Sequence, residues 1–197
     1  ILHLLRHADG YVSGQQLCET FGVSRTAVWK VINQLKEEGY VIDSVQNKGY
    51  RITEYPDIIT ASEIESLLLD DSGNMQGICR HIQYFDKTDS TNNQAKLAAE
   101  KNAPDGTLFV AECQTGGRGR RGKTWESPAG SGIWMSLLLR PDISPESASM
   151  LTLVLAVAMV DAINEEVQDA KCYVKWPNDI VLNNRKISGT LTEMSAE

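Results

Sequence analysis

The sequence predicts an α+β fold in two parts, and two observations lead to this prediction. Within residues 1–54, three short helical patterns bounded by glycine or a capping serine precede two runs of strand-forming residues. Beyond residue 60, strand-length apolar runs alternate with longer helical patterns. That alternation is typical of a mixed sheet in an α/β layer.

The composition is that of an ordinary soluble globular protein. The 197 residues are 42% hydrophobic and 23% charged, with a formal net charge of -7. Net acidity argues against a general coating of nucleic acid but permits a local basic face. The four cysteines form no CxxC pair, so we expect reduced thiols and a cytoplasmic location (Cys18, Cys79, Cys113 and Cys172). No signal peptide is visible, and because Ile1 lies inside a helical pattern we expect the natural protein to be longer.

The first three elements are predicted as helices from their boundaries. Residues 1–8 form a helical pattern that ends at Asp9-Gly10. Ser13 can cap a second helix, "GQQLCETF", which Gly22 ends. Ser24 can cap a third, "RTAVWKVINQLKEEG", which ends at Gly39.

The third helix has two faces, and a hairpin follows it. Val28, Val31, Ile32 and Leu35 share its apolar side by the 3.6-residue period. The runs "YVIDSV" and "GYRI" read as strands joined by residues 46–49. Three helices and a hairpin predict a winged helix-turn-helix over residues 1–54, whose third helix would enter the major groove of DNA. The residues predicted to face DNA are Ser24, Arg25, Thr26, Lys30, Asn33 and, in the wing, Lys48.

A linker over residues 55–60 and a second domain over residues 61–197 are predicted next. The predicted strands are 81–85, 107–113, 131–140, 172–182 and 186–194, and the predicted helices are 92–102 and 145–168. The apolar run 150–160 is too short to span a bilayer, so we expect a buried helix and no membrane partner.

The stretch "GGRGRRGKTW", residues 116–125, carries the strongest chemical pattern. Glycine lets backbone N–H groups approach an anion, and arginine adds forked donors for carboxylate or phosphate oxygens. The spacing is neither that of a Walker loop nor that of the dinucleotide fingerprint. From charge alone, a solvated basic loop or an RNA-binding patch stays an alternative to a small anionic ligand.

Each of the other motifs, taken alone, is only weak evidence for a functional site. "DSTN", residues 89–92, fits a plain helix cap or a set of hydrogen-bonding groups aimed at a ligand. "KWPND", residues 175–179, fits a tight turn with a buried Trp176. Lys186 alone would be a solvated lysine. His3 and His7 have metal-binding spacing, but no further ligand completes a set, so side chains alone predict no metal site.

Together the motifs resemble the biotin–protein ligase family, in particular its bifunctional members that also repress biotin genes. The matching runs are "DSTN", "AECQTGGRGRRGKTW", "GSGIWMSLLLRP", "KWPNDI" and "RKISGTLTE", in the family's order. The run "SGQQLCETFGVSRTAVWKVINQL" and the "NKGY" wing resemble its DNA-binding domain. The resemblance implies a ligase domain of the class II tRNA synthetase-like type, incomplete here, with a C-terminal β-barrel absent. Ser188 and Thr190 stand where the family often has small or apolar residues.

The resemblance also implies roles for individual residues. Ser90, Thr91 and Gln114 would bond the ureido ring of biotin, with Asn92 supporting the turn. Arg118, Gly119, Arg120 and Lys186 would meet its carboxylate and the phosphates, and Arg118, Arg120 and Lys186 would be catalytic. Lys175 and Asp179 would order the site or position the acceptor lysine. The ATP and phosphate set adds Arg121, Trp125, Lys175 and Asn178, and the apolar wall of biotin adds Ile187, Gly189 and Leu191.

The implied activity is the two-step attachment of biotin to a protein. Biotin and ATP, the latter with Mg²⁺, would give biotinyl-5′-AMP, and a lysine of a biotin carboxyl carrier protein would then take the biotin. Operator DNA and a ligand-favoured homodimer are the other implied partners. Two alternatives stay open: a lipoate-type ligase, and a ligand-sensing DNA-binding regulator without ligase activity.

Overall fold

The structure is a computed structural model that describes residues 1–70, 72–167 and 171–195. The chain divides into two units. The first comprises Ile1–Gln114 with Ser127–Leu139, and the second comprises Thr115–Glu126 with Arg140–Glu197. The Gly-Arg stretch therefore belongs to the second unit, although the strands before and after it belong to the first.

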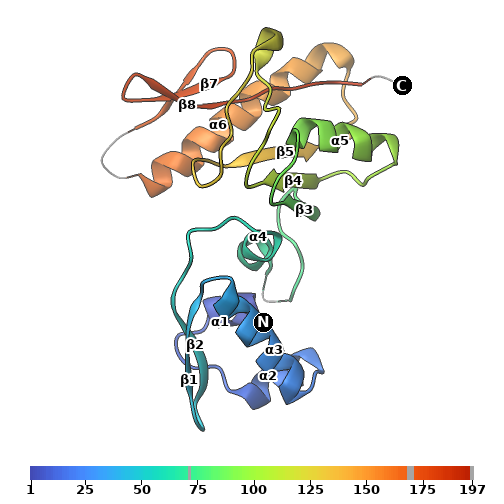
Figure 1. Cartoon of the computed structure of the whole chain (residues 1–197). Helices are drawn as coiled ribbons and strands as arrows, with labels where there is room; N and C mark the ends of the chain where they lie inside the picture. Colours follow the sequence, from blue (N-terminus) through green and yellow to red (C-terminus); the bar gives the residue numbers. More distant parts are fainter. Residues whose placement is uncertain (71, 168–170, 196–197) are drawn as a thin grey trace. The chain divides into compact units, whose positions relative to one another are not determined.

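The first unit begins with the predicted winged helix (Figure 1). Its elements are α1 (Leu2–Arg6), α2 (Gly14–Phe21), α3 (Arg25–Glu37), β1 (Val41–Val45) and β2 (Gly49–Glu54). Ser13 and Ser24 cap α2 and α3 as predicted, since each hydroxyl accepts from the backbone N–H three residues on. Gly22 ends α2 in the left-handed region, at φ 63°.

The core of this domain comes from the apolar face predicted for α3. Val28, Ile32 and Leu35 are buried there, together with Leu17 of α2. The wing closes on the segment before α2 through reciprocal Val12 and Tyr50 backbone bonds. Gly49 permits this approach, because a Cβ there would lie 2.0 Å from the Val12 carbonyl oxygen.

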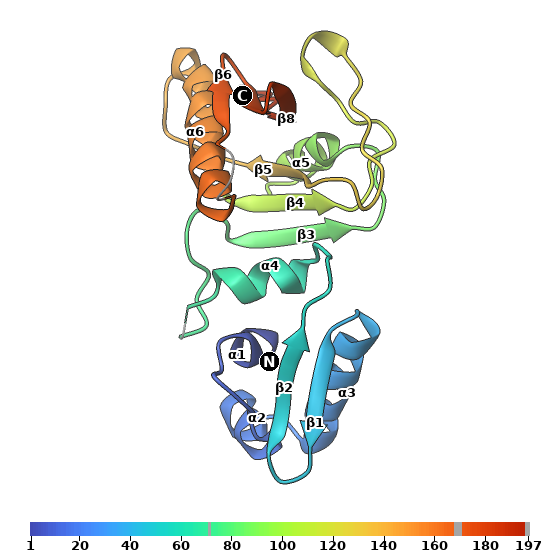
Figure 2. The ribbon, with the colours of Figure 1, turned by 90° about the vertical axis from the view of Figure 1, so that its left-hand side faces the viewer.

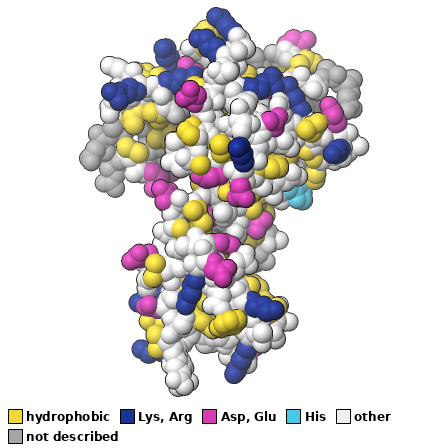
Figure 3. Space-filling view, in the orientation of Figure 1, with side chains coloured by type: hydrophobic (Ala, Val, Ile, Leu, Met, Phe, Trp, Pro, Cys, Tyr) yellow, Lys and Arg dark blue, Asp and Glu magenta, His cyan; other side chains and the backbone are white. Residues whose placement is uncertain are grey.

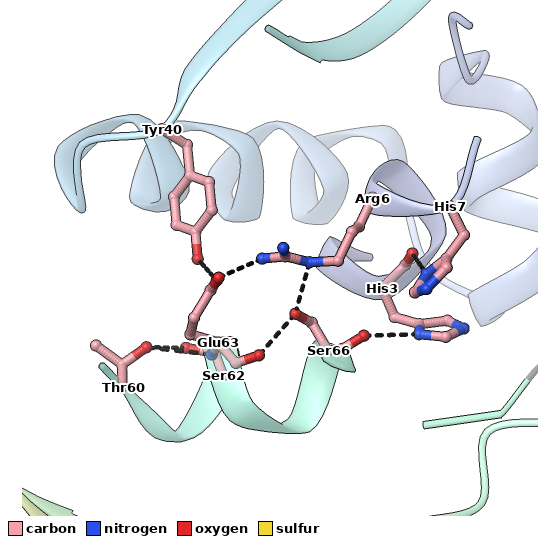
Figure 4. Close-up of polar contacts among 8 residues, drawn as sticks. All are labelled: His3, Arg6, His7, Tyr40, Thr60, Ser62, Glu63 and Ser66. Atoms are coloured by element: carbon pink, nitrogen blue, oxygen red, sulfur yellow. Dashed lines mark hydrogen bonds and ion pairs between the residues drawn. The ribbon is translucent and has the colours of Figure 1, made fainter. Parts of the chain in front are cut away.

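A helix that the sequence patterns did not predict, α4 (Ala61–Leu68), packs on α1 (Figure 4). The Glu63 carboxylate accepts from the Arg6 guanidinium and from the Tyr40 hydroxyl. Arg6 Nε also donates to Ser66 Oγ, at 3.0 Å. Burial, and then the hydrogen bond to Glu63, raises the pKa of the Tyr40 phenol well above its usual value, so Tyr40 stays a donor.

The residues predicted as a linker, 55–60, contain no helix or strand but do contact this network. The Arg6 guanidinium lies 4.5 Å from the Tyr55 ring centroid, and Ile58 packs against the core of the winged helix. The segment between β2 and α4 is therefore held against α1 and the core.

A mixed sheet with the order β3-β4-β5 completes the first unit (Figure 2). β3 (His81–Phe85) runs parallel to β4 (Thr107–Ala111), and β5 (Trp134–Leu138) runs antiparallel to β4. The helix α5 (Thr91–Glu100) packs on β4 and β5. Three predicted strands and one predicted helix are thus confirmed, with ends that differ by a few residues.

The second unit contains α6 (Ala148–Glu166) and a separate antiparallel sheet, β6-β7-β8. The prediction of a single strand over residues 172–182 is wrong, whereas the prediction that "KWPND" ends a strand in a proline turn is confirmed. The "KWPND" turn, with a cis Trp176–Pro177 bond, divides the run into β6 (Tyr173–Lys175) and β7 (Asp179–Leu182). β8 (Arg185–Gly189) ends five residues before the predicted strand does.

The long helix α6 is less buried than predicted. Of its residues only Ala156 is fully buried, while Met150, Val154 and Val157 are more than half exposed. The segment Pro145–Glu166 has the length and apolar content of a membrane span. One such helix is weak evidence, since core helices of soluble proteins share these properties.

Candidate active site

In the first unit, a buried polar cluster surrounds the start of α5. The Ser90 and Thr91 side chains are 2% and 3% exposed. Gln114 Oε1 accepts from the Thr91 backbone N–H at 2.8 Å and lies 3.1 Å from Thr91 Oγ1. Ser90 occupies the N-cap position, yet its side chain makes no capping bond. A plain helix cap therefore does not account for the Ser90 hydroxyl.

Two serines that sequence reasoning missed belong to this cluster. Ser127 Oγ accepts from Gln114 Nε2 at 2.9 Å, which orients the amide of Gln114. Ser136, on β5, lies 2.8 Å from Thr91 Oγ1 and donates to the Asn92 side chain. Ser136 lies in the "WMSLL" strand. The alternation of side chains along a strand predicts which residues share a face of the sheet, but not which side chains lie next to Ser136.

Asp89 stabilises the same turn as an anion. Its carboxylate accepts from the side chains of Asn93, Gln94 and Thr88. These bonds, the one from Asn93 most of all, lower the pKa of Asp89 to about 2. The start of α5 thus carries a carboxylate that stays charged throughout the physiological range.

In the second unit, the Gly-Arg stretch forms a small hairpin rather than an open loop. Trp125 N–H donates to the Gly117 carbonyl at 2.9 Å, and Gly119 N–H donates to the Lys123 carbonyl at 2.7 Å. Arg121 and Gly122 turn the tip, both at positive φ. The hairpin and residues 191 and 193 line a pocket. Lys and Arg side chains gather at the top of Figure 3, where Figure 1 places this hairpin.

The three residues predicted to be catalytic each contact a polar partner within the second unit. Arg118 pairs with Glu193 at 2.7 Å, and Arg120 donates to Asn178 Oδ1 at 2.8 Å. Lys186 pairs with Asp179 at 2.6 Å. Glu193, which ends the "RKISGTLTE" run but had no role assigned from the sequence, thus holds an arginine predicted to meet phosphate.

Two neighbouring residues also restrict the position of the Lys186 side chain. Its Nζ lies 4.9 Å from the Trp125 ring centroid, a cation–π distance that joins β8 to the hairpin. A Cβ at position 189 would lie 2.8 Å from the same Nζ. Gly189 therefore leaves the space across which the lysine reaches Asp179.

The remaining predicted residues differ in their placement. Asn178 is buried, and its Nδ2 donates to the Thr190 carbonyl at 3.1 Å. Leu191 lines the pocket beside the hairpin. Lys175 and Arg121 are exposed. Trp176 is 78% exposed, so the alternative interpretation of "KWPND" as a tight turn with a buried Trp176 does not hold.

Metal ligands are not gathered anywhere in the described part of the chain. No group of three or more His, Cys, Asp or Glu side chains occurs among those residues. His3 donates instead from Nδ1 to the Ser66 carbonyl at 2.9 Å. The four cysteines are free thiols.

The residues predicted to face DNA lie on α3 and in the wing. Arg25, Thr26 and Lys30 are exposed, whereas Asn33 is half-buried. Arg25 donates to the Gln15 side chain at 3.1 Å. Lys48 lies 5.8 Å from the Tyr11 ring centroid. On the face seen in Figure 3, basic side chains are scattered among acidic and apolar ones over the winged helix.

Comparisons with known proteins agree with both parts of the chain. Residues 84–196 match the Biotin/lipoate A/B protein ligase family, and residues 1–51 match an HTH domain. A bifunctional ligase/repressor BirA from Bacillus subtilis (strain 168) is 46% identical over 187 residues, which are 95% of this chain and 56% of that protein. The protein of the same name from Escherichia coli (strain K12) is 36% identical, over all of this chain and 58% of its own length.

A solved structure supports the same relationship. A biotin protein ligase from Aquifex aeolicus, in complex with biotin and ATP, is 36% identical with a TM-score of 0.52. The match covers 58% of this chain and 47% of that one. This chain thus spans little more than half the length of the two BirA relatives. The matched ligase segment covers more than half of the 197 residues, and the chain belongs to the biotin/lipoate A/B protein ligase family, with an HTH domain at its start.

Proposed function

We propose that the whole protein is an ATP-dependent biotin–protein ligase that also represses transcription by binding operator DNA. The observation that carries the ligase proposal is the set of cations in the second unit. Arg118, Arg120 and Lys186 each contact a carboxylate or amide oxygen at 2.6–2.8 Å. Anionic ligands would find donors that are already positioned.

The first reaction step explains why so many cations are needed. The biotin carboxylate attacks the α-phosphorus of ATP, and pyrophosphate leaves. Two anions must approach each other, so donors fixed where negative charge develops lower the barrier most. Mg²⁺, bound with the nucleotide, would neutralise further phosphate charge.

In this proposal, the Glu193 and Asp179 carboxylates occupy the positions that the ligand anions would take. Each carboxylate holds one cation in place. The biotin carboxylate and the nucleotide phosphates would exchange for these partners. This exchange limits the cost of ordering two long side chains when the ligand binds.

The polar cluster around α5 favours biotin over lipoate. Thr91, Gln114, Ser127 and Ser136 supply amide and hydroxyl groups within hydrogen-bonding distance of one another. A ureido ring carries both N–H donors and a carbonyl acceptor, which suit such groups. The dithiolane ring of lipoate has no comparable donors. The family includes ligases for both biotin and lipoate, so the choice of biotin is part of the proposal.

The second step would transfer biotin to a lysine of a biotin carboxyl carrier protein in the cytoplasm. Because the mixed anhydride hydrolyses readily, the glycine-rich hairpin would serve as a lid that excludes water. The DNA-binding proposal rests on the match to an HTH domain and on the exposed outer face of α3. A ligand-favoured homodimer would place two such domains on one operator.

Substrate-dependent exchange of pyrophosphate into ATP tests the ligase proposal on the full-length protein. We expect exchange with biotin and none with lipoate or octanoate. Exchange with lipoate alone would identify a lipoate ligase instead. Operator binding that responds to biotin in a protein without exchange would identify a sensing regulator, and would contradict the enzyme proposal.

A further inference from the structure

An exposed tryptophan lies among the residues of α3 that are predicted to face DNA. The Trp29 side chain is 58% exposed. By the helical period it lies beside Thr26 and Asn33, which are three and four residues away, and Lys30 follows it around the helix. The adjoining face of α3 supplies the core through Val28 and Ile32, which are each 1% exposed. Trp29 therefore contributes little to the packing of its own domain.

Exposure alone would carry no conclusion, because single apolar side chains are common on protein surfaces. The position of Trp29 is more informative. The Ser24 cap defines the start of α3 at Arg25, so Trp29 lies in the first half of the helix. In helix-turn-helix domains, residues near the N-terminus of the recognition helix contact base edges. Trp29 is flanked there by a cation, Lys30, whose side chain is also exposed.

We propose that Trp29 reads sequence, by packing its indole ring against the 5-methyl group of a thymine in the major groove. This inference rests on the proposed DNA-binding function. The methyl group of thymine is the apolar feature that base edges present in that groove, so it is the natural contact for an apolar ring. On binding, the indole ring would move from an exposed position into a contact from which most water is excluded.

The charge of the domain makes a base contact of this kind important. Residues 1–54 contain six Lys or Arg (Arg6, Arg25, Lys30, Lys36, Lys48 and Arg51) and six Asp or Glu (Asp9, Glu19, Glu37, Glu38, Asp43 and Glu54), so their net charge is zero. Attraction to phosphates supplies most of the affinity of strongly basic DNA-binding domains. A neutral domain must take a larger share of its affinity from contacts with base edges.

The test combines protein and DNA substitutions in one cycle. The full-length protein first selects its preferred duplex from a random-sequence library. Each thymine of that duplex is then replaced by uracil, which removes only the methyl group. Affinities of the parent, Trp29→Ala and Trp29→Phe for every duplex are measured at one salt concentration. Leu97→Ala removes an exposed apolar side chain from α5 and serves as the matched control.

We expect at least one thymine whose replacement weakens binding by the parent about 4-fold, the effect of burying one methyl-sized group. Trp29→Ala should bind the parent duplex roughly 10-fold more weakly, as for the loss of one base contact. The affinity of Trp29→Ala should not fall further when uracil replaces thymine at that position. Trp29→Phe should retain part of the discrimination, and Leu97→Ala should match the parent throughout.

Two results would overturn the inference while leaving DNA binding intact. One is that Trp29→Ala shows the same uracil penalties as the parent at every thymine. The other is that Trp29→Ala binds with unchanged affinity. If the parent selects no duplex at all, the DNA-binding function itself fails. Biotin-dependent pyrophosphate exchange by the same Trp29→Ala preparation verifies that its ligase domain is folded.

Discussion

Lys186 shows how a lone lysine in the sequence acquires a defined position. Asp179 pairs with its ammonium group, the Trp125 ring lies beside it, and Gly189 leaves open the space between them. The three neighbours come from β7, the hairpin and β8. The motif "RKISG" therefore needs glycine because a side chain passes over it.

The change Gly189→Ala should displace Lys186 without unfolding the protein. The new Cβ would meet Lys186 Nζ at 2.8 Å and Cε at 2.9 Å, which are the far end of a flexible side chain. Misplacing a catalytic group by about 1 Å can cost up to roughly 100-fold in rate. We expect biotin-dependent pyrophosphate exchange to fall about 10- to 100-fold, with the urea midpoint of the full-length protein unchanged.

Gly14→Ala is the matched control, since the nearest side-chain atom to its new Cβ, on Tyr50, lies at an ordinary 3.7 Å. Normal exchange by Gly189→Ala would show that Lys186 does not need its present position.

Lys186→Ala and Arg120→Ala should fail in different ways. Lys186 is proposed to meet the reacting carboxylate and the α-phosphate. Losing one preorganised contact of this kind costs about 3–4 kcal/mol, or roughly 100- to 1,000-fold in rate. Arg120 holds the hairpin to Asn178, so its loss should also let biotinyl-AMP escape before transfer. Pyrophosphate exchange measures the first step, and the released fraction of biotinyl-AMP measures retention.

The exposed lysine Lys101, at the C-terminal end of α5, supplies the control Lys101→Ala. Tight retention by Arg120→Ala would mean that the hairpin is not a lid.

At the scale of elements, α4 is the connection that the sequence patterns did not predict. It contacts both α1 and β3, which lie on either side of it in the chain. Arg6, Tyr40 and Ser66 converge on its Glu63, and the Arg6 and Glu63 side chains are 16% and 14% exposed (Figure 4). This mostly buried network anchors α4 to the winged helix.

Replacing Glu63 by alanine should destabilise the first unit. Arg6 and the Tyr40 hydroxyl would lose their shared acceptor while staying mostly buried, and leaving buried donors unpaired costs about 1–3 kcal/mol. We expect a lower urea midpoint for the transition that exposes the winged helix. Hydrogen exchange at α1 would report that transition.

The exposed Glu65, on the same helix, gives the matched change Glu65→Ala. Equal midpoints for the two variants would refute a stabilising role for the network.

At the scale of the whole molecule, the proposed function joins ligand binding to DNA binding. A domain with zero net charge should bind operator weakly as one copy. A homodimer favoured by biotinyl-AMP would span two half-sites about one helical turn, or a multiple of it, apart. Coupling of this kind typically amounts to about 1–3 kcal/mol, or roughly 5- to 150-fold in affinity.

Operator affinity of the full-length protein should therefore rise within that range when biotin and ATP are both added. Biotin with α,β-methylene-ATP is the control, because the bond between its α- and β-phosphorus atoms cannot be cleaved and no adenylate can form. Equal affinity under all conditions would exclude the coupling. Sedimentation under the same conditions would show whether the dimer forms together with the gain in affinity.

Local patterns in the sequence were enough to predict the winged helix and most of the strands. Ser13, Ser24 and Gly22 mark helix ends through bonds to their own neighbours, so the sequence contains the whole interaction. The α4 helix was missed because "ASEIESLL" is short and its stability comes from packing on α1. The 172–182 run was misjudged because a proline turn folds it back on itself.

In the candidate site, too, some features follow from the sequence and others only from the tertiary structure. The sequence by itself determined which residues are proposed to carry the chemistry, since "GGRGRRGKTW", "DSTN", "KWPND" and "RKISG" contain the proposed cations and polar groups. Only the tertiary structure decided their partners: Glu193 for Arg118, Asp179 for Lys186, and Ser136 for the turn at Thr91. These pairs join residues 75, 7 and 45 positions apart. Residue type and spacing describe what a side chain can bind, whereas sheet register and hairpin closure determine which group it meets.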